Sequence, residues 1–410
     1  MLIFILLLVF FAYASWKVEK SLISPSVMFA TLWLIIIFFY NLKLENYFDV
    51  RDSTVWIIII GVFSFFLGGC CSPKGKPKFM NTGISITSVF LLQIISILVF
   101  LPDAVEAAAK LSSGMTLQDL RADMDFYTMG RTSGQNGVLS ILKNFILTPF
   151  MYLSYPLVSY VFVSSIKRDK ISKYVLYLEI IIIAISIVRL GGRIQIFYFL
   201  FSFLTIYLYL KNRITLSSRV QWSIYALLII AAVSFFTTSV SRGITDVPMS
   251  FYSYLTCCVP MLDIGLQNET LHTFGAMSLA APLMLFDSLF RFLGLGGLSI
   301  IEVIYKMLEK TQETVIIGNG ISSNAFYSLF YWFYHDFGIL GVAIMSFLYG
   351  IIAKYFYNVV KAGYSPWSLI IYVLILQGVA FSFIRFQFAT NYYFYSFLLI
   401  PIFLKHHFPK

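Results

Sequence analysis

Two arginines, Arg189 and Arg193, flank a Leu-Gly-Gly turn between two long apolar segments. An arginine at the centre of a bilayer costs about 2.5–3.5 kcal/mol on insertion scales, so charge beside a membrane span indicates a function. The planar guanidinium makes two parallel, charge-assisted hydrogen bonds to a phosphate and stays protonated when partly desolvated. The pattern predicts a site for a phosphorylated ligand. The simpler alternative is that each arginine extends to the lipid headgroups.

Two further arginines belong to the same predicted site. Arg242 is followed by a glycine at the start of a long polar segment, and Arg385 lies in an aromatic segment. Glycines beside Arg193 and Arg242 leave room for a bulky head group to approach. We predict that Arg189, Arg193, Arg242 and Arg385 converge on one diphosphate.

A histidine–aspartate pair is the second candidate. His335 and Asp336 directly precede an apolar segment, and either side chain could accept a proton from a ligand hydroxyl. The alternative for Asp336 is a helix cap that bonds the free N–H groups of the next span. His272 is a weaker candidate in the same polar loop. Three nearby aromatic residues have faces of the kind that stack on sugar rings: Tyr331, Trp332 and Tyr334.

Glu179 is a lone carboxyl inside an apolar segment. It could act as a proton relay. Because Lys173 precedes it by about a turn and a half of helix, we expect the two side chains to pair at the cytoplasmic side.

The composition is that of a membrane protein. Of the 410 residues, 59% are hydrophobic and 12% are charged, against about a quarter charged in soluble domains. Apolar runs of about 20 residues recur, enough for a helix to cross roughly 30 Å of hydrocarbon, and they lack the alternation of a barrel strand. The sequence predicts an all-α integral membrane protein with about 11 transmembrane helices. The expected spans are 2–16, 23–42, 54–70, 84–101, 138–166, 174–188, 194–210, 220–240, 337–357, 368–383 and 392–404.

The charge pattern predicts the orientation. Most lysines fall on one face, which the positive-inside rule makes cytoplasmic, while most acids and eight of the eleven arginines fall on the other. The N-terminus is then outside and the C-terminus is cytoplasmic. The net charge of +10 is explained by these lysines, and we expect no nucleic-acid partner.

Two outer loops, 103–137 and 241–336, are long enough to hold a site within a single polytopic domain, 1–410. The apolar stretch 276–300 inside the larger loop is interrupted by charged residues and by a glycine-rich break. A single crossing there would invert the orientation of everything that follows. We therefore expect re-entrant or interfacial helices, with a hairpin of two short spans as the alternative.

No metal or cofactor is expected. The cysteines form two adjacent pairs, at 70–71 and 257–258, without the spacing of a metal site. The chain also lacks a glycine-rich phosphate loop. The arginines could take the place of a metal in neutralising a diphosphate leaving group.

With these features the chain resembles the Wzy-type O-antigen and oligosaccharide repeat-unit polymerases. The resemblance covers the topology and three local motifs: 189–193 before an aromatic-rich span, 241–243 at the start of the large outer loop, and 334–341 at its end. It implies a metal-independent, inverting membrane glycosyltransferase of the GT-C type in the bacterial inner membrane. The growing chain on undecaprenyl diphosphate would move to the terminal sugar of a new lipid-linked repeat unit.

The resemblance also implies roles and partners. The four arginines would hold the diphosphate, and Asp336 or His335, with His272 behind them, would orient or deprotonate the acceptor hydroxyl. The partners would be undecaprenyl-diphosphate-linked donor and acceptor, the bilayer and a chain-length regulator. Two alternatives stay open: an O-antigen ligase-type glycan transferase, and a flippase for lipid-linked oligosaccharides.

Overall fold

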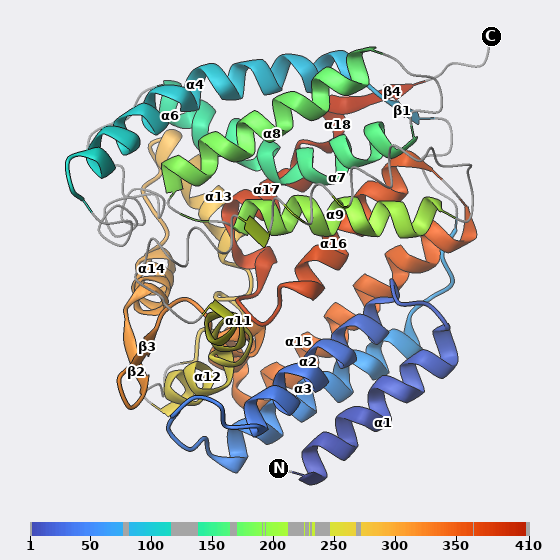
Figure 1. The fold of residues 1–410 in the computed structure, drawn as a ribbon, viewed down its shortest axis with the longest axis vertical. Helices are drawn as coiled ribbons and strands as arrows, with labels where there is room; N and C mark the ends of the chain where they lie inside the picture. Colours follow the sequence, from blue (N-terminus) through green and yellow to red (C-terminus); the bar gives the residue numbers. More distant parts are fainter. Residues whose placement is uncertain are drawn as a thin grey trace. The chain divides into compact units, whose positions relative to one another are not determined.

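The structure of the chain, a computed structural model, is mostly helical (Figure 1). It describes residues 2–76, 82–115, 138–164, 170–190, 192, 194–211, 247–267, 272–363 and 365–406, together with positions 225, 229, 232 and 233. The chain divides into two compact units. Unit 1 comprises Met1–Lys78, Pro248–Tyr364 and Ile375–Phe394, and unit 2 comprises Phe79–Val247, Ser365–Leu374 and Tyr395–Lys410.

Unit 1 is built mainly from helices at the two ends of the chain and from the large loop. Its elements are α1 (Leu2–Glu19), α2 (Pro25–Asn41), α3 (Asp52–Cys71), α11 (Val247–Thr256), α12 (Cys258–Gln267), α13 (Ala280–Phe292), α14 (Ser299–Gln312), β2 (Val315–Gly318), β3 (Ile321–Ser323), α15 (Ser328–Ala362) and η2 (Gln387–Ala389). Strands β2 and β3 form an antiparallel hairpin whose turn is Asn319-Gly320, a sequence that favours tight hairpin turns.

Unit 2 is built mainly from the middle of the chain. Its elements are β1 (Thr82–Ile84), α4 (Ile86–Ser112), α6 (Val138–Leu142), the π-helical turn η1 (Lys143–Leu147), α7 (Thr148–Ser164), α8 (Lys170–Leu190), α9 (Ile194–Leu210), α18 (Ile400–Phe403) and β4 (Leu404–His406). Strands β1 and β4 pair antiparallel, with Gly83 opposite Lys405. Helices α16 (Pro366–Ala380) and α17 (Asn391–Leu398) contribute residues to both units.

Six of the described helices are long and apolar enough to cross a bilayer: α1, α3, α4, the continuous helix Leu139–Ser164 that includes α7, α8 and α15. Helices α2, α9 and α16 are apolar but shorter. The expected all-α membrane architecture is therefore confirmed. The number of eleven spans and the GT-C architecture stay predictions.

Two expected spans need separate mention. Span 220–240 lies outside the described residues, apart from isolated positions. Span 392–404 is not one helix, because α17 ends at Leu398 and α18 begins at Ile400. Pro401 accounts for the break, since proline has no N–H to donate to the preceding turn.

The apolar stretch 276–300 forms α13 and the turn that leads to α14. The 13 residues of α13 rise only about 20 Å, which is short of a bilayer core. Helix α14 carries Glu302, Lys306 and Lys310. Asp287 accepts hydrogen bonds from Arg291 Nε (2.8 Å) and from the Leu298 N–H (2.6 Å), so one carboxylate joins both ends of the turn. The lengths and charges of the two helices favour the interfacial or re-entrant interpretation over a hairpin of spans.

Helices α3 and α15 pack closely in unit 1, where Figure 1 draws them side by side. Glycines make this approach possible. A side chain at Gly68 would meet the Phe347 carbonyl oxygen, and a side chain at Gly350 would meet the Phe65 carbonyl oxygen. In a membrane interior, where helix association relies on van der Waals contact, small residues at the crossing allow the backbones to touch.

Helix α15 is broken near its first third. Phe337 (φ −147°, ψ 27°) and Gly338 (φ 62°, ψ −144°) have non-helical backbone angles inside Ser328–Ala362. The angles of Gly338 lie in a region that L-residues with a Cβ enter only with strain. The break coincides with residue 337, where the sequence predicted that span 337–357 begins at the outer face.

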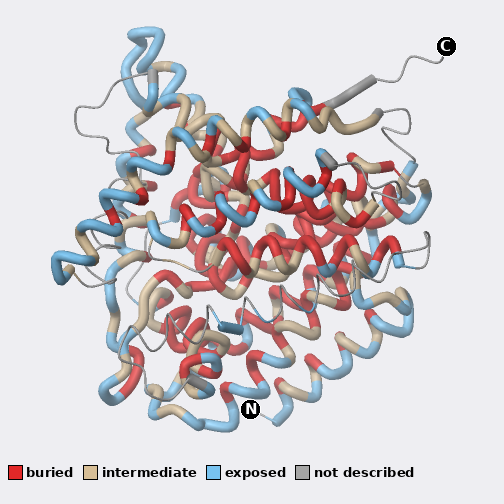
Figure 2. Tube along the Cα trace, turned by 45° about the horizontal axis from the view of Figure 1, so that its top comes forward, coloured by how far each residue is buried: buried red, intermediate tan, exposed pale blue. Residues whose placement is uncertain are grey.

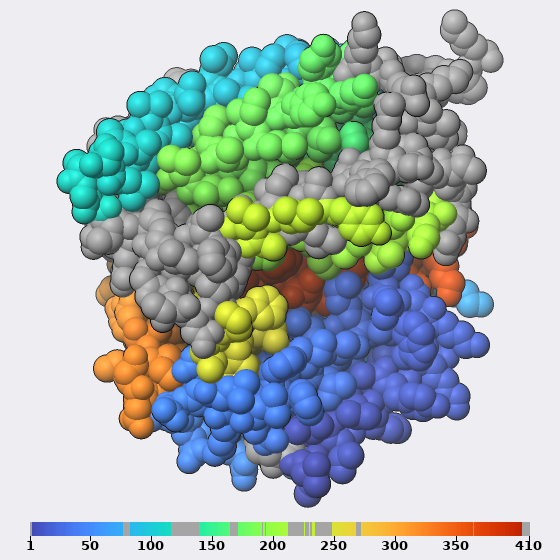
Figure 3. Space-filling model, in the orientation of Figure 1, coloured from blue at the N-terminus to red at the C-terminus, as the bar shows by residue number. Residues whose placement is uncertain are grey.

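Helices α4 and α8 run parallel in unit 2, because Gln93 in the first third of α4 contacts Glu179 at the middle of α8, and Asp103, ten residues further along α4, approaches Arg189 at the end of α8. Their side chains form one continuous surface in Figure 3. Helix α4 has exposed positions along its length, whereas most of α7 is buried. Figure 2 colours the trace by burial, with buried residues in red and exposed residues in pale blue. A core cluster of unit 2 joins α4, η1, α7 and α8: Phe100, Ala104, Leu147, Met151, Ile182 and Ile185.

The break in α15 makes Gly338 a sensitive position. We expect Gly338→Ala to lower the free energy of unfolding by about 1–3 kcal/mol, the cost of a strained backbone. The cause would be strain rather than collision, because the new Cβ would lie 3.5 Å from His272 Cε1, an ordinary contact.

Thermal unfolding of the purified protein in detergent measures this effect. Gly192→Ala is the control, because its backbone needs no positive φ and its Cβ would lie 3.7 Å from the nearest atom, the Leu190 oxygen. Equal melting temperatures for the two variants would contradict the assigned backbone strain.

Candidate functional site

The side chain of Asp336 is completely buried and is held by four donors. Its Oδ1 accepts hydrogen bonds from the Thr273 hydroxyl (2.6 Å) and from the N–H groups of Gly275 (3.1 Å) and Met277 (3.0 Å). Its Oδ2 accepts from the N–H of Ser278 (3.0 Å). A carboxylate has about four acceptor positions, so these contacts nearly saturate it.

The backbone around Asp336 is bonded to the same segment. The Thr273 N–H donates to the His335 carbonyl (2.9 Å), and the Phe274 N–H donates to the Asp336 carbonyl (3.1 Å). Helix α15 breaks directly after Asp336. The carboxylate caps the turn that leads into α13. The capping alternative named the next span as the partner, and in this respect it was wrong, because the N–H donors come from about sixty residues earlier in the chain.

The three candidate catalytic residues lie near this break in unit 1, and no contact joins their side chains among the described interactions. His335 is buried (1% exposed) and its ring lies 4.1 Å from that of Tyr331, edge to face. His272 is exposed, and its ring lies against Gly338. An exposed imidazole beside a buried His-Asp pair can exchange a proton with a bound molecule.

The aromatic residues expected to stack on sugars pack against protein. Tyr331 and Trp332 are both 2% exposed. The Tyr331 ring lies 4.9 Å from that of Tyr327 and 5.5 Å from that of Trp332. Burial also raises the pKa of Tyr327 to about 12, so its hydroxyl stays protonated at neutral pH. Of the three candidates, half-buried Tyr334 has the most surface left. Sugar stacking stays a prediction.

Arg189 is packed at the end of α8. Its guanidinium carbon lies 4.1 Å from the centre of the Phe100 ring, and its Nη1 lies 3.9 Å from Asp103 Oδ2. Lys143 also binds Asp103, at 2.8 Å. Arg189 is therefore a largely buried side chain (12% exposed) within a small cluster of charges in unit 2.

Of the other three arginines that were predicted to bind the diphosphate, the structure describes one, Arg385. Arg193 and Arg242 lie outside the described residues. Arg385 lies between α16 and η2 and is half-buried in unit 1. The convergence of the four arginines stays a prediction.

A charge pair that the sequence analysis did not anticipate, between exposed Arg51 and buried Asp263, ties the start of α3 to α12. Arg51 donates from Nε to Asp263 Oδ1 and from Nη2 to the Asp263 carbonyl, both at 3.0 Å. Thr54 and Gln267 also donate to the same carboxylate. In the sequence, this site is indicated only by Asp263, a charged residue in an apolar segment. Nothing near Asp263 in the sequence identifies Arg51, more than two hundred residues away, as its partner.

Glu179 does not pair with Lys173, and that prediction was wrong. Its carboxyl is fully buried between Gln93 and Ser154, whereas Lys173 is exposed. The physical reason is helical geometry, because residues six apart lie on different faces of a helix.

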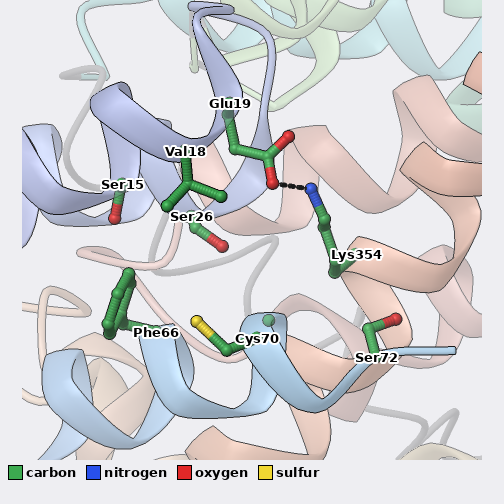
Figure 4. A pocket seen from close by; sticks show the side chains of 9 residues that line it. Ser15, Val18, Glu19, Ser26, Phe66, Cys70, Ser72 and Lys354 are labelled. Carbon is green, nitrogen blue, oxygen red and sulfur yellow. Dashed lines mark hydrogen bonds and ion pairs between the residues drawn. The ribbon is translucent and has the colours of Figure 1, made fainter.

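A cavity of about 150 Å³ lies between α1, α3 and α15 in unit 1. Glu19 and Lys354 form an ion pair there, and Figure 4 shows their side chains pointing toward each other. Each side chain is only 10% exposed, and the pair is neutral as a whole. The sequence assigned Lys354 to the cytoplasmic face, so this cavity is distinct from the break in α15, which was predicted to lie at the outer face.

Among the residues that the structure describes, no three histidine, cysteine, aspartate or glutamate side chains are grouped as metal ligands. All four cysteines are free. Burial raises the pKa of the Cys257 thiol to about 12, so it is a poor nucleophile and a poor metal ligand at neutral pH.

No protein-family model, curated protein or solved structure matches this chain. Its function is therefore inferred from its residues and their geometry.

The four hydrogen bonds to Asp336 lead to a prediction. In Asp336→Asn one acceptor oxygen becomes an NH₂ group, which would face an N–H donor and leave it unpaired. We expect a loss of about 1–3 kcal/mol in the free energy of unfolding, measured by thermal or denaturant unfolding. Asp49→Asn is the control, because the Asp49 side chain is 89% exposed and its ion pair among the described residues is with exposed Lys43. Native stability of Asp336→Asn together with lost activity would instead assign Asp336 to catalysis.

Proposed function

We propose that this chain polymerises undecaprenyl-diphosphate-linked oligosaccharide repeat units by inverting glycosyl transfer on the outer face of the bacterial inner membrane. Lipid-linked donor and acceptor are its substrates, and a chain-length regulator is its partner protein. The six apolar helices support the membrane setting that a polyprenyl substrate requires.

The observation that carries the proposal is the break of α15. His335 and Asp336 precede it, and His272 lies against Gly338. Irregular backbone at membrane depth is tolerated where protein buries it or where it lines a cavity, and membrane proteins place binding sites at such breaks. Histidines near this break, one exposed and one buried, are suited to proton transfer from a sugar hydroxyl.

In the proposed reaction a hydroxyl oxygen of the acceptor sugar attacks the anomeric carbon of the donor. The bond from that carbon to the diphosphate oxygen breaks, and undecaprenyl diphosphate leaves with the electron pair. The hydroxyl proton passes to a base. Because Asp336 already accepts four hydrogen bonds, we assign the proton to His272 or His335, and the positioning of the histidines to Asp336.

The charge that grows on the diphosphate needs fixed donors. Arginines at the outer ends of spans supply them without a metal ion. The proposed diphosphate ligands are Arg189, Arg193, Arg242 and Arg385.

A second candidate, a flippase for the same lipid-linked oligosaccharide, is favoured by one observation. Glu179 is a carboxyl buried within a span, and such residues are typical of proton-coupled transporters. An O-antigen ligase-type transferase shares the donor and the leaving group with the polymerase and differs in its acceptor.

Purified protein in lipid vesicles with a defined lipid-linked repeat unit tests these alternatives. The polymerase is expected to produce a ladder of products that differ by one repeat. Movement of the lipid across the vesicle without a ladder would identify a flippase. Transfer of the glycan only to a different acceptor, added separately, would identify a ligase.

Arg242→Lys tests the diphosphate assignment. Lysine keeps the charge but loses the planar fork, so we expect normal expression and a loss of polymer on the order of 100-fold, as when one such donor is removed elsewhere. Arg291→Lys is the control, because Arg291 is 58% exposed and bonds only the carboxylate one turn before it in the described structure. Near-normal polymer from Arg242→Lys would remove Arg242 from the site.

A further inference from the structure

Glu179 lies fully buried at the centre of α8, where α4 and α7 pack against it. Ser154 Oγ of α7 is 2.6 Å from Glu179 Oε1, and Gln93 Nε2 of α4 is 2.8 Å from Oε2. All three helices are candidate membrane spans. The carboxyl is thus enclosed by neutral groups at the depth where a free charge is most costly.

A count of hydrogens shows which form of the carboxyl fits this arrangement. The Gln93 amide nitrogen contacts two acceptors, Glu179 Oε2 and the Val175 carbonyl (3.0 Å), and it has two hydrogens for them. The Ser154 hydroxyl contacts Glu179 Oε1 and the Met151 carbonyl (2.8 Å), but it has one hydrogen for two contacts. The missing hydrogen is supplied if Glu179 is protonated on Oε1 and donates to Ser154.

Among the described residues, the elements around Glu179 offer no cation in place of that proton. Helix α4 has no titratable side chain from Ile86 to Pro102. The titratable groups of α7 and α9 are tyrosines, of which buried Tyr155 is the one that interacts with Glu179. On α8 itself, Lys173 is exposed, and Arg189 lies about 15 Å further along the helix against Phe100. Among the described residues no ion pair reaches Glu179.

We propose that Glu179, Ser154 and Gln93 form a proton-binding site inside unit 2, whose carboxyl holds one proton in this arrangement of helices and exchanges it with water. The carboxylic acid releases H⁺ to water and leaves a carboxylate. The carboxylate then accepts from both Gln93 and Ser154, and the Met151 carbonyl loses the hydrogen bond from the Ser154 hydroxyl. The site connects three spans, so its protonation state is linked to how α4, α7 and α8 pack. It does not depend on the proposed glycosyl transfer.

An apolar carbodiimide tests the site in the full-length protein reconstituted in lipid. The reagent adds to a protonated carboxyl, takes up its hydrogen, and rearranges to a stable acylurea of known added mass. Labelling therefore follows the protonated fraction. We expect one modified carboxyl within the spans, mapped by peptide mass spectrometry to Glu179, with labelling that falls about tenfold per pH unit above its midpoint.

Two variants sharpen the test. Glu179→Gln keeps a donor and an acceptor of similar shape and should abolish the adduct. Gln93→Leu removes an N–H donor that favours the ionised form, so the midpoint should move to higher pH. Glu45→Gln, in the loop between α2 and α3, is the control, and it should leave the labelling of Glu179 and its pH midpoint unchanged. If Glu179→Gln does not fold, two results still test the proposal: the position of the adduct in the native protein, and the change in the labelling midpoint of Gln93→Leu.

Three outcomes would overturn the proposal. Labelling that does not change with pH would show a permanently neutral, structural carboxyl. Labelling only after unfolding would show a group sealed from water. Protection by Na⁺ at constant pH and ionic strength would show that the bound cation is sodium rather than a proton.

Discussion

The carboxylate of Asp336 holds together two segments that are about sixty residues apart in the chain. It accepts from Thr273, Gly275, Met277 and Ser278, and the backbone on either side of it bonds the same turn. The turn before α13 supplies hydrogen-bond donors to the carboxylate, and the carboxylate in return accepts from N–H groups of the turn that would otherwise have no partner. Without this exchange, a broken helix and a charged side chain would both be exposed to an apolar environment, which is costly.

The sequence predicted the fold well wherever a single local property decided it. A run of about 20 apolar residues is a helix in a bilayer whatever lies around it, so α3, α4, α8 and the second part of α15 were expected. The sequence also predicted that a span begins at residue 337, which is where the structure has the break in α15. The split of span 392–404 was missed, although Pro401 is a local signal for it.

Partners distant in the chain could not be predicted. The donors to Asp336, the pairing of Arg51 with Asp263 and the environment of Glu179 depend on how helices pack, and no spacing rule links such positions. For the candidate site, the sequence grouped His335 with Asp336 because they are adjacent in the chain, and their catalytic role stays a prediction. It did not reveal that the acceptor positions of Asp336 are already in use.

The fully buried carboxyls of Asp336 and Glu179 differ in what surrounds them. Three of the four donors to Asp336 are backbone N–H groups, which are fixed in place and can only donate; the fourth is the Thr273 hydroxyl. Glu179 faces the Ser154 hydroxyl and the Gln93 side-chain amide. Both groups can rotate: the hydroxyl can donate or accept, and the amide donates through its nitrogen and accepts through its oxygen. A carboxylate bound by backbone amides is a rigid connection between segments, whereas one bound by rotatable side chains can gain or lose a hydrogen without moving the backbone.

The backbone at Gly338 has a consequence for handedness. Its angles, φ 62° and ψ −144°, are close to the mirror image of the extended polyproline conformation that L-residues adopt readily. The chain at this point therefore follows a path natural to a D-amino acid, and glycine, which is achiral, is the only standard residue that follows it without strain. A single D-residue placed there by chemical synthesis would match the backbone better than any of the other nineteen genetically encoded side chains.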